Sequence, residues 1–379
     1  MSDFSLKGII DSTLREGEQR AGVFFEHHHK LDIVEKLVAL GIEEIELGVA
    51  SPRSPELLTL VPDALQIANK KAKIALWTRC NEEDIRFARQ CTPDTLSLSI
   101  PVSDILIKEK LAHTRPWILE KLDRSIKQAV DLGFQTVSVG LEDATRADAA
   151  FLFRVVQVIN NSGASRLRLA DTVGIGSPGQ ISTLVKDIQK AGSIPIGVHT
   201  HNDFGMATAN AMAALEAGAQ WVDATVLGLG ERTGNCRLEE IVGFLSLQKG
   251  IQRYQAENLK TLCDTVATAA QTHIHPNHPV VGKEIFTCES GLHVHGLTVN
   301  PKTYEPYDPL KLGRGRTLLF GSKTGKRAVQ HTLHSAGMAF SSEQAEDLVQ
   351  KIRLLAKSGA KPLVKNELIR LAREKIHSV

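Results

Sequence analysis

The sequence has few cysteines and few aromatic residues. Its 379 residues include five cysteines, which are scattered, odd in number and without a Cys-x-x-Cys pair. This usage is typical of reduced thiols in a cytosolic protein and argues against a disulfide framework or a zinc-thiolate site. We therefore expect a cytoplasmic location.

An excess of charge and long apolar runs are also missing. A formal net charge of +2 gives no basic footprint for nucleic acid or for a membrane surface. The apolar runs are far shorter than the ~20 residues that a membrane span needs, and MSDFSLKGIID at the start has no signal-peptide core. The sequence therefore predicts neither a nucleic-acid partner nor a membrane.

A regular alternation of short β-like runs with helical stretches is present instead. The runs cover residues 8–15, 43–48, 73–79, 95–102, 136–143, 166–173, 195–202 and 221–228. Three of the helical stretches close on Gly41, Gly133 and Gly218, and glycine is a common helix stop. Eight strands alternating with helices predict an α/β fold, a (β/α)8 TIM barrel, in residues 1–255. The alternative, a doubly wound open sheet, would favour a Gly-rich phosphate loop after the first strand, and DSTLREGEQ is not one.

The alternation of strands and helices ends after about residue 250. A helical stretch is followed by a segment rich in Pro, His and aromatic residues, and helical patterns return from about residue 322. We expect residues 256–379 to form a C-terminal irregular flap and a small helical subdomain.

Two histidines one residue apart, in GVHTHNDFG at 197–205, form the first candidate site. Strand side chains alternate between faces, so His199 and His201 point the same way. Taken alone, the pattern also fits a half-buried strand whose polar residues face water. However, polar residues follow nearly every predicted strand, and (β/α)8 enzymes build their chemistry at those strand ends. The position therefore favours a metal site.

A carboxylate would complete this site. Glu16 lies where the first strand ends, and Asn235, after the last strand, would add a carbonyl oxygen. Two imidazoles and a carboxylate leave open positions on a divalent ion, and without thiolates Mg, Mn and Zn all remain candidates. A 2-oxo acid would fill the open positions through its ketone and carboxylate. Arg15 would stabilise charge on the ketone oxygen, and Thr172 would hydrogen-bond the carboxylate.

Two other motifs are interpreted as structural. EHHHK at 26–30 resembles a metal-binding tag, but it opens an amphipathic helix and is interpreted as its solvated start. GSKTGKR at 321–327 is one residue short of a P-loop and has Arg where Ser or Thr must hold magnesium.

Five motifs resemble the DRE-TIM metallolyases of the Claisen-condensing branch, which includes 2-isopropylmalate, citramalate and homocitrate synthases. They are DSTLREGEQ (11–19), LADTVG (169–174), HTHNDFGMATAN (199–210), GLGERTGN (228–235) and ESGLHVHG (289–296), in order along nearly the whole chain. Within the group, LSIPVSDILIKEKL and GLEDATRAD look most like the homocitrate synthases of nitrogenase cofactor synthesis, whereas LREGEQ is similar to those of the lysine pathway.

The resemblance implies an acyltransferase that condenses acetyl-CoA with 2-oxoglutarate to give homocitrate and CoA. The metal ligands that it implies are Glu16, His199 and His201, with Asn235 nearby. It also implies Arg15 at the 2-oxo group and Thr172 at the carboxylate.

The resemblance further implies a catalytic histidine, His293, that reaches into the barrel of a partner subunit. Glu142 and Tyr304 would lie near it, and the protein would be a homodimer with shared active sites. Two residues depart from the family pattern, His295 where relatives often have Asp and Cys288 where many have His.

A five-carbon 2-oxo diacid brings a second carboxylate, which is costly to bury unpaired. We predict that Arg79 pairs with it, and Thr78, Ser97 and Ser99 are further strand-end donors. The alternative for Arg79 is a structural salt bridge to a rim acid such as Glu46.

Other functions are compatible with the same barrel. They are 2-isopropylmalate or citramalate synthesis, the bond cleavage of hydroxymethylglutaryl-CoA lyase, and a 2-oxo acid or CoA sensor without catalysis. The long C-terminal extension argues against the lyase, and the intact set of rim residues argues against the sensor.

Overall fold

The computed structural model describes residues 5–289, 293–294, 296–297 and 300–376. Eight parallel strands close into a barrel in chain order, with β1 paired to both β2 and β8. The strands are β1 (Gly8–Asp11), β2 (Glu44–Val49), β3 (Lys73–Arg79), β4 (Thr95–Pro101), β5 (Thr136–Glu142), β6 (Arg166–Asp171), β7 (Ile196–Thr200) and β8 (Trp221–Ala224). The predicted TIM barrel is confirmed.

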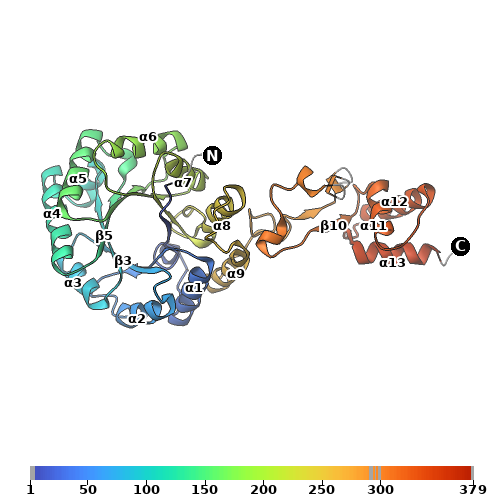
Figure 1. Cartoon of the computed structure of the whole chain (residues 1–379), viewed down its shortest axis with the longest axis horizontal. Helices are drawn as coiled ribbons and strands as arrows, with labels where there is room; N and C mark the ends of the chain where they lie inside the picture. Colours follow the sequence, from blue (N-terminus) through green and yellow to red (C-terminus); the bar gives the residue numbers. More distant parts are fainter. Residues whose placement is uncertain (1–4, 290–292, 295, 298–299, 377–379) are drawn as a thin grey trace. The chain divides into compact units, whose positions relative to one another are not determined.

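Helices surround the strands, as Figure 1 shows. They are α1 (His27–Leu40), α2 (Leu57–Ala68), α3 (Glu82–Cys91), α4 (Arg115–Asp131), α5 (Ala149–Ser162), α6 (Pro178–Gln189), α7 (Ala207–Glu216) and α8 (Leu238–Gly243). EHHHK opens α1, as expected. Gly41 ends α1 with a φ of 96°, a backbone conformation that favours glycine, which confirms it as a helix stop.

Ion pairs fill much of the barrel interior. On β2 and β6, Glu44 binds Arg166, and Glu46 Oε1 lies 2.9 Å from Arg168 Nη1. The alternating neighbours, Ile45 among them, are also fully buried, so both faces of these strands are covered. Aliphatic side chains usually dominate such interiors, and here two layers of charged side chains replace part of them.

The loop after β1 is tied to the loop after β8. Asp11 accepts hydrogen bonds from the backbone N–H of Thr13 at 3.0 Å and from its hydroxyl at 2.8 Å. The Thr13 hydroxyl oxygen in turn accepts the N–H of Val226, in the turn η4 (Val226–Gly228), at 2.8 Å. These bonds lie at the seam where the barrel closes and support the loop that carries Arg15 and Glu16.

The chain divides into two compact units, 1–274 and 275–379. The first unit extends beyond the expected boundary at 255, because α9 (Leu259–Ala269) packs on α1 of the barrel.

The second unit combines helices with a small sheet. The helices α11 (Lys326–His334), α12 (Ser342–Lys357) and α13 (Lys365–Ile376) agree with the predicted helical subdomain. A three-stranded sheet, which the sequence did not predict, joins β9 (Thr287–Cys288), β10 (Thr317–Phe320) and β11 (Leu363–Val364) in the order β11-β10-β9. Phe320, Leu333, Leu348 and Leu368 belong to a core of this unit.

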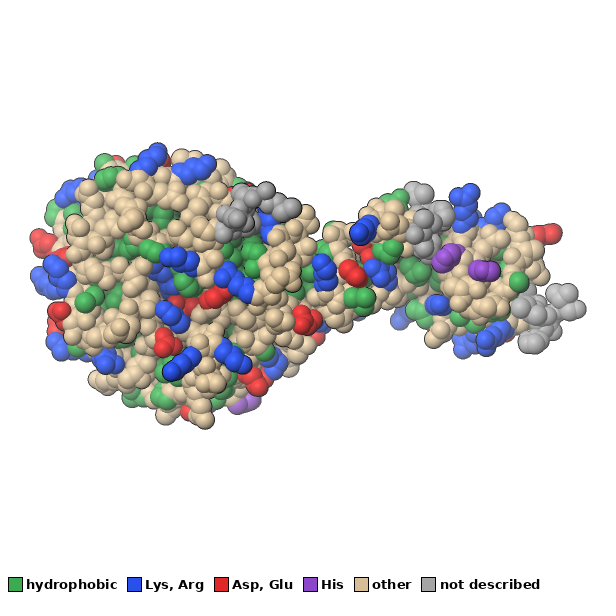
Figure 2. Space-filling view, viewed as in Figure 1, with side chains coloured by type: hydrophobic (Ala, Val, Ile, Leu, Met, Phe, Trp, Pro, Cys, Tyr) green, Lys and Arg blue, Asp and Glu red, His purple; other side chains and the backbone are tan. Residues whose placement is uncertain are grey.

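Side chains of both charges are mixed on the barrel surface seen in Figure 2. On the face in Figure 2, Lys and Arg side chains lie among Asp and Glu side chains. Within the described ranges, each helix is too short or too polar to cross a lipid bilayer.

Candidate metal centre

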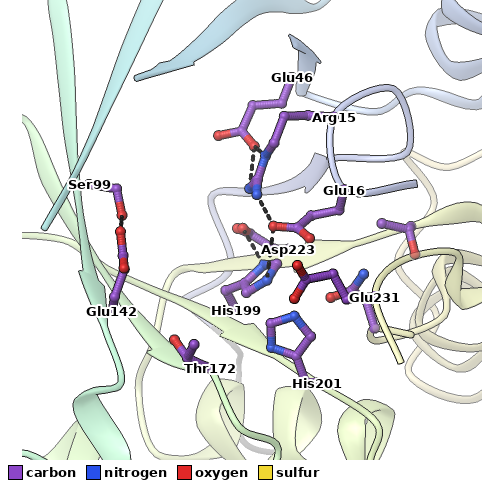
Figure 3. A network of polar contacts seen from close by, with 12 residues as sticks. Arg15, Glu16, Glu46, Ser99, Glu142, Thr172, His199, His201, Asp223 and Glu231 are labelled. Carbon is purple, nitrogen blue, oxygen red and sulfur yellow. Dashed lines mark hydrogen bonds and ion pairs between the residues drawn. The ribbon is translucent and has the colours of Figure 1, made fainter. Parts of the chain in front are cut away.

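Glu16, His199 and His201 meet at the carboxyl-terminal end of the barrel. One ligand atom of each lies within 4.8 Å of the others, and all three residues are buried. β7 ends at Thr200, and His201 lies in a bridge with Asn235 of the loop after β8. The two imidazole rings are 4.9 Å apart between centroids and nearly perpendicular (Figure 3). The structure therefore brings the predicted trio together.

Hydrogen bonds fix the tautomer of both imidazoles. His199 Nδ1 lies 3.0 Å from a carboxylate oxygen of Asp223, and His201 Nδ1 lies 3.1 Å from the backbone oxygen of Asp171. Carbonyl and carboxylate oxygens only accept, so each Nδ1 carries the proton and each Nε2 keeps a lone pair. Burial lowers the pKa of both histidines. The pKa of His201 falls to about 3, because the neighbouring imidazole of His199 lowers it further. Both are therefore in the neutral form that binds metals.

Three buried polar atoms at this centre have no hydrogen-bond partner among the described residues. They are Glu16 Oε2, His201 Nε2 and Asn235 Oδ1. The Asn235 amide nitrogen donates to Leu229 O at 2.8 Å, which leaves its carbonyl oxygen as the free atom. Buried acceptors without a partner cost about 1–3 kcal/mol each, and a divalent cation would satisfy all three. This set of nitrogen and oxygen donors fits Mg, Mn or Zn.

Glycines in GLGERTGN allow Asn235 to reach the centre. A Cβ on Gly230 would lie 2.1 Å from the Asn235 side-chain nitrogen, so only glycine fits there. Gly234 has a φ of 88°, and a Cβ on it would lie 1.8 Å from the oxygen of Gly228. These glycines therefore serve a tight turn around Asn235.

Arg15 is fixed beside the trio. Its Nε and Nη2 lie 2.9 and 2.7 Å from Glu46 Oε2, and its Nη1 pairs with Glu16 (Figure 3). Its guanidinium carbon lies 5.6 Å from the centroid of the Trp77 ring. Burial lowers the pKa of Arg15 and the Glu46 carboxylate opposes this, so a cation is held next to the candidate metal ligand Glu16.

A cavity of about 220 Å³ opens above these groups. Its lining includes most of the predicted residues together with several that the sequence did not single out: Arg15, Glu16, Gln19, Trp77, Ser99, Lys110, Gly140, Glu142, Arg168, Ala170, Thr172, His199, His201 and Glu231. Three cationic side chains and three carboxylates line the cavity together with two hydroxyls, so it suits a small polar ligand.

Thr172 and Glu142 both line this cavity, and Figure 3 shows them away from Arg15 and Glu46. The Thr172 oxygen accepts the N–H of Asp143 at 2.8 Å, which leaves its hydroxyl proton free to donate. Glu142 accepts from the Ser99 hydroxyl at 3.0 Å and from the Lys110 ammonium at 2.9 Å. Lys110 ends the π-helical turn η2 (Leu106–Lys110), and no pattern in the sequence pointed to it.

Arg79 does not lie where the sequence prediction placed it. Its Nε and Nη2 bind Asp84 of α3 at 2.9 and 2.7 Å, and its side chain is 63% exposed and outside the cavity lining. The alternative, a structural salt bridge, is what the structure shows, but its partner is Asp84 and not Glu46, which Arg15 and Arg168 bind. The physical reason is local, since Asp84 is a buried acid only five residues further along the chain.

Of the other predicted donors for a second carboxylate, two are engaged by other residues and one lines the cavity. Ser97 accepts from Arg168 Nη2 at 3.0 Å, and the Thr78 hydroxyl donates to the oxygen of Ala50 at 3.2 Å. Ser99 lines the cavity.

His293 and Tyr304 lie together in the second unit. Their ring centroids are 4.3 Å apart, and both side chains are exposed. Cys288 ends β9, and His295 lies outside the described residues.

Comparison with known families follows the division into two units. The model of the HMGL-like family matches residues 7–269, which is more than half of the chain. The chain belongs to the HMGL-like family. In this HMGL-like protein, a second model, described as homocitrate synthase post-HMGL domain-like, matches residues 280–360. The resemblance to the DRE-TIM metallolyases is thereby confirmed.

Relatives with similar sequence identity to this HMGL-like protein are named as different synthases. "2-isopropylmalate synthase 2" of Caldanaerobacter subterraneus is 38% identical over 96% of this chain and 94% of its own. "Homocitrate synthase 1" of a Nostoc species is 38% identical over 98% of both chains. "(R)-citramalate synthase CimA" of Methanocaldococcus jannaschii is 35% identical over 97% of this chain and 74% of its own. These relatives are acyltransferase-type synthases, and similarity alone does not separate their acceptors.

Solved structures support the barrel. Hydroxymethylglutaryl-CoA lyase from Pseudomonas aeruginosa aligns with a TM-score of 0.62 at 18% identity, over 72% of this chain and 96% of its own. The HMG-CoA lyase from Brucella melitensis aligns with a TM-score of 0.60 at 19% identity, over 70% of this chain and 98% of its own. At this identity the likeness shows the shared fold.

Proposed function

We propose that the protein is a metal-dependent homocitrate synthase, which condenses acetyl-CoA with 2-oxoglutarate. The observation that carries the proposal is the buried trio of Glu16, His199 and His201, with free ligand atoms beside the Arg15 cation. The lining of its cavity includes the cations of Arg15, Lys110 and Arg168 as well as three carboxylates. The cations and the bound metal ion would together hold an oxo acid.

The trio and Asn235 would hold the divalent cation, which when bound supplies a Lewis acid for the ketone of the acceptor. Arg15 lies beside it and neutralises the negative charge that grows on the ketone oxygen. The Thr172 hydroxyl, held through its oxygen by Asp143, donates its free proton to the acceptor carboxylate.

The bond-forming step needs a carbon nucleophile from acetyl-CoA. A base removes a methyl proton, the new carbon–carbon bond forms at the ketone carbon, and water then cleaves the thioester to release homocitrate and CoA. In our proposal His293, adjacent to Tyr304, takes part in this chemistry in the barrel of a partner subunit, with Glu142 at the cavity wall.

Two observations favour homocitrate over the other products. The second unit matches a model described from homocitrate synthases, and several of the relatives at 38% identity have that name. The second candidate is 2-isopropylmalate synthesis, which a relative of equal identity supports. The lyase reaction is less well supported, since the lyase structures cover only 70–72% of this chain.

The test is a condensation assay. Metal-loaded protein is incubated with acetyl-CoA and each of 2-oxoglutarate, 2-oxoisovalerate and pyruvate, and free thiol is measured. We expect the highest kcat/KM with 2-oxoglutarate. Preference for another acceptor would replace the homocitrate assignment, and thiol release from none of them would contradict synthase activity altogether.

A further inference from the structure

Arg168 provides a second link between Arg15 and His199, which are already joined through Glu16. Its Nη1 lies 2.9 Å from Glu46 Oε1 and 2.7 Å from Asp223 Oδ2. The other oxygen of Glu46 binds Arg15, and the same Asp223 oxygen binds His199 Nδ1 at 3.0 Å. An unbroken chain of charged hydrogen bonds therefore runs from Arg15 through Arg168 to a metal ligand.

The residues of this hydrogen-bond network are buried. Arg168 is 3% exposed, Glu46 is inaccessible, and Asp223 is 2% exposed. Burial alone would raise the pKa of Glu46, but Arg15 and Arg168 together lower it to about 2, so it stays ionised. Without the guanidinium, two buried carboxylates would face each other with one fewer cation between them, and this arrangement is strongly unfavourable.

We propose that Arg168 is a positioning residue that sets both the orientation of the metal ligand His199 and the position of Arg15. The planar guanidinium suits this role because it reaches two carboxylates and the Ser97 hydroxyl at fixed angles. A carboxylate behind a ligating imidazole tunes metal binding, and here Arg168 holds that carboxylate. The inference rests on the proposed metal centre.

The layer below supplies a matched control. Arg166, also on β6 and 3% exposed, pairs with Glu44 and donates to Ser138 at 3.0 Å. Its guanidinium carbon lies 4.6 Å from the Trp221 ring. Among the described residues these partners of Arg166 include neither Arg15 nor a proposed metal ligand, so its substitution disturbs a similar buried ion pair without touching the centre.

The experiment compares Arg168→Lys with Arg166→Lys. Both changes keep a positive charge and remove the planar fork. Co²⁺ affinity is measured by calorimetry, the visible spectrum of the Co²⁺ protein is recorded, and thermal unfolding reports stability. We expect Arg168→Lys to weaken Co²⁺ binding about tenfold or more and to alter the spectrum. Arg166→Lys should lower stability by about as much as Arg168→Lys does. It should leave the Co²⁺ affinity within about twofold of the wild type and the spectrum unchanged.

A milder pair covers the case in which Arg168→Lys does not fold. Ser97→Ala removes one hydrogen bond from Arg168, and Ser138→Ala removes the equivalent bond from Arg166. Weaker Co²⁺ binding in Ser97→Ala than in Ser138→Ala supports the proposal.

The proposal is overturned if Arg168→Lys and Arg166→Lys bind Co²⁺ with equal affinity, or if Ser97→Ala and Ser138→Ala do. The result also separates this inference from the proposed function. A wild-type protein that binds no Co²⁺ removes the metal centre and this inference with it. Normal Co²⁺ binding that Arg168→Lys leaves unchanged overturns the role of Arg168 alone.

Discussion

The position of one proton on each imidazole makes the candidate metal centre able to bind a cation. Each imidazole presents Nε2 because its Nδ1 donates to an oxygen, from Asp223 in one case and from the backbone of Asp171 in the other. A second trio, Glu26, His28 and His29, also gathers possible ligand atoms, but Glu26 and His28 are exposed and only His29 is half-buried. The two trios therefore allow a direct comparison.

We expect His199→Ala and His201→Ala each to abolish most metal binding. Loss of an outer-shell partner already costs about 10–100-fold in affinity, so loss of a ligand should cost about 100-fold or more. Unfolding should change little, because these residues add little to the apolar core. The matched control is His28→Ala with His29→Ala in the second trio, measured by calorimetry. Full metal occupancy in the His199→Ala, His201→Ala double variant would reject the assignment.

Glu239 gives a pH prediction. This fully buried residue of α8 accepts the N–H of Leu227 at 2.9 Å, and burial raises its pKa from 4.5 to about 7. The folded state therefore keeps a proton that the unfolded state releases above about pH 4.5, so stability falls as the pH rises through this window and levels off above about pH 7.

Glu239→Gln removes this titration. Between about pH 5 and about pH 7.5 the wild type should lose about 2–3 kcal/mol relative to Glu239→Gln, as measured by urea unfolding at each pH. Parallel curves for the two proteins would show that Glu239 does not titrate in this range.

Among the elements, the seam between β1 and β8 controls the position of the site. Arg15 and Glu16 follow β1, whereas Asn235 follows β8, and Thr13 joins the two loops through Val226. Thr13 is fully buried, so both of its hydrogen bonds are shielded from water.

Thr13→Val is expected to destabilise the protein by about 1–3 kcal/mol, because it leaves the Val226 N–H without its acceptor. It should also weaken metal binding by displacing Glu16. Thr13→Ser keeps both hydrogen bonds and serves as the control, with thermal unfolding and calorimetry as measurements. Wild-type behaviour of Thr13→Val would mean that the seam does not depend on this hydroxyl.

The strands could be predicted because their apolar alternation is regular, but alternation does not say which face is inside. Glu44 and Arg166 lie in alternating patterns that equally fit a strand with one face in water. In the closed barrel both faces are buried, and these side chains pair within it. For the same reason Arg168 was missed, whereas Glu16 and His199 were found from their place at strand ends.

Arg79 shows the limit of that reasoning. A strand end fixes where a side chain begins, but a long side chain is free to turn, and a buried acid in the next helix binds it. The small sheet of the second unit was missed because two of its strands have only two residues each, which is too short for a period to show.

At the scale of the whole molecule, the predicted active site is divided between two units. The metal centre belongs to the unit of residues 1–274, and the adjacent rings of His293 and Tyr304 belong to the unit of residues 275–379. Our proposal of a homodimer assigns them to different subunits.

Subunit mixing tests this arrangement. Arg15→Ala and His293→Ala should each be nearly inactive, and heterodimers of the two should regain part of the activity because one site then combines intact residues from both chains. Thiol release in heterodimers purified with two affinity tags is the measurement. Heterodimers of verified composition that stay inactive would contradict shared sites.

The seam also has a consequence during synthesis. Glu16 leaves the ribosome before His199, His201 and Asn235, which follow about two hundred residues later. The nascent chain therefore cannot assemble the full proposed ligand set, Asn235 included, until its last barrel strand has emerged. Up to that moment an ion cannot assist folding through all four residues.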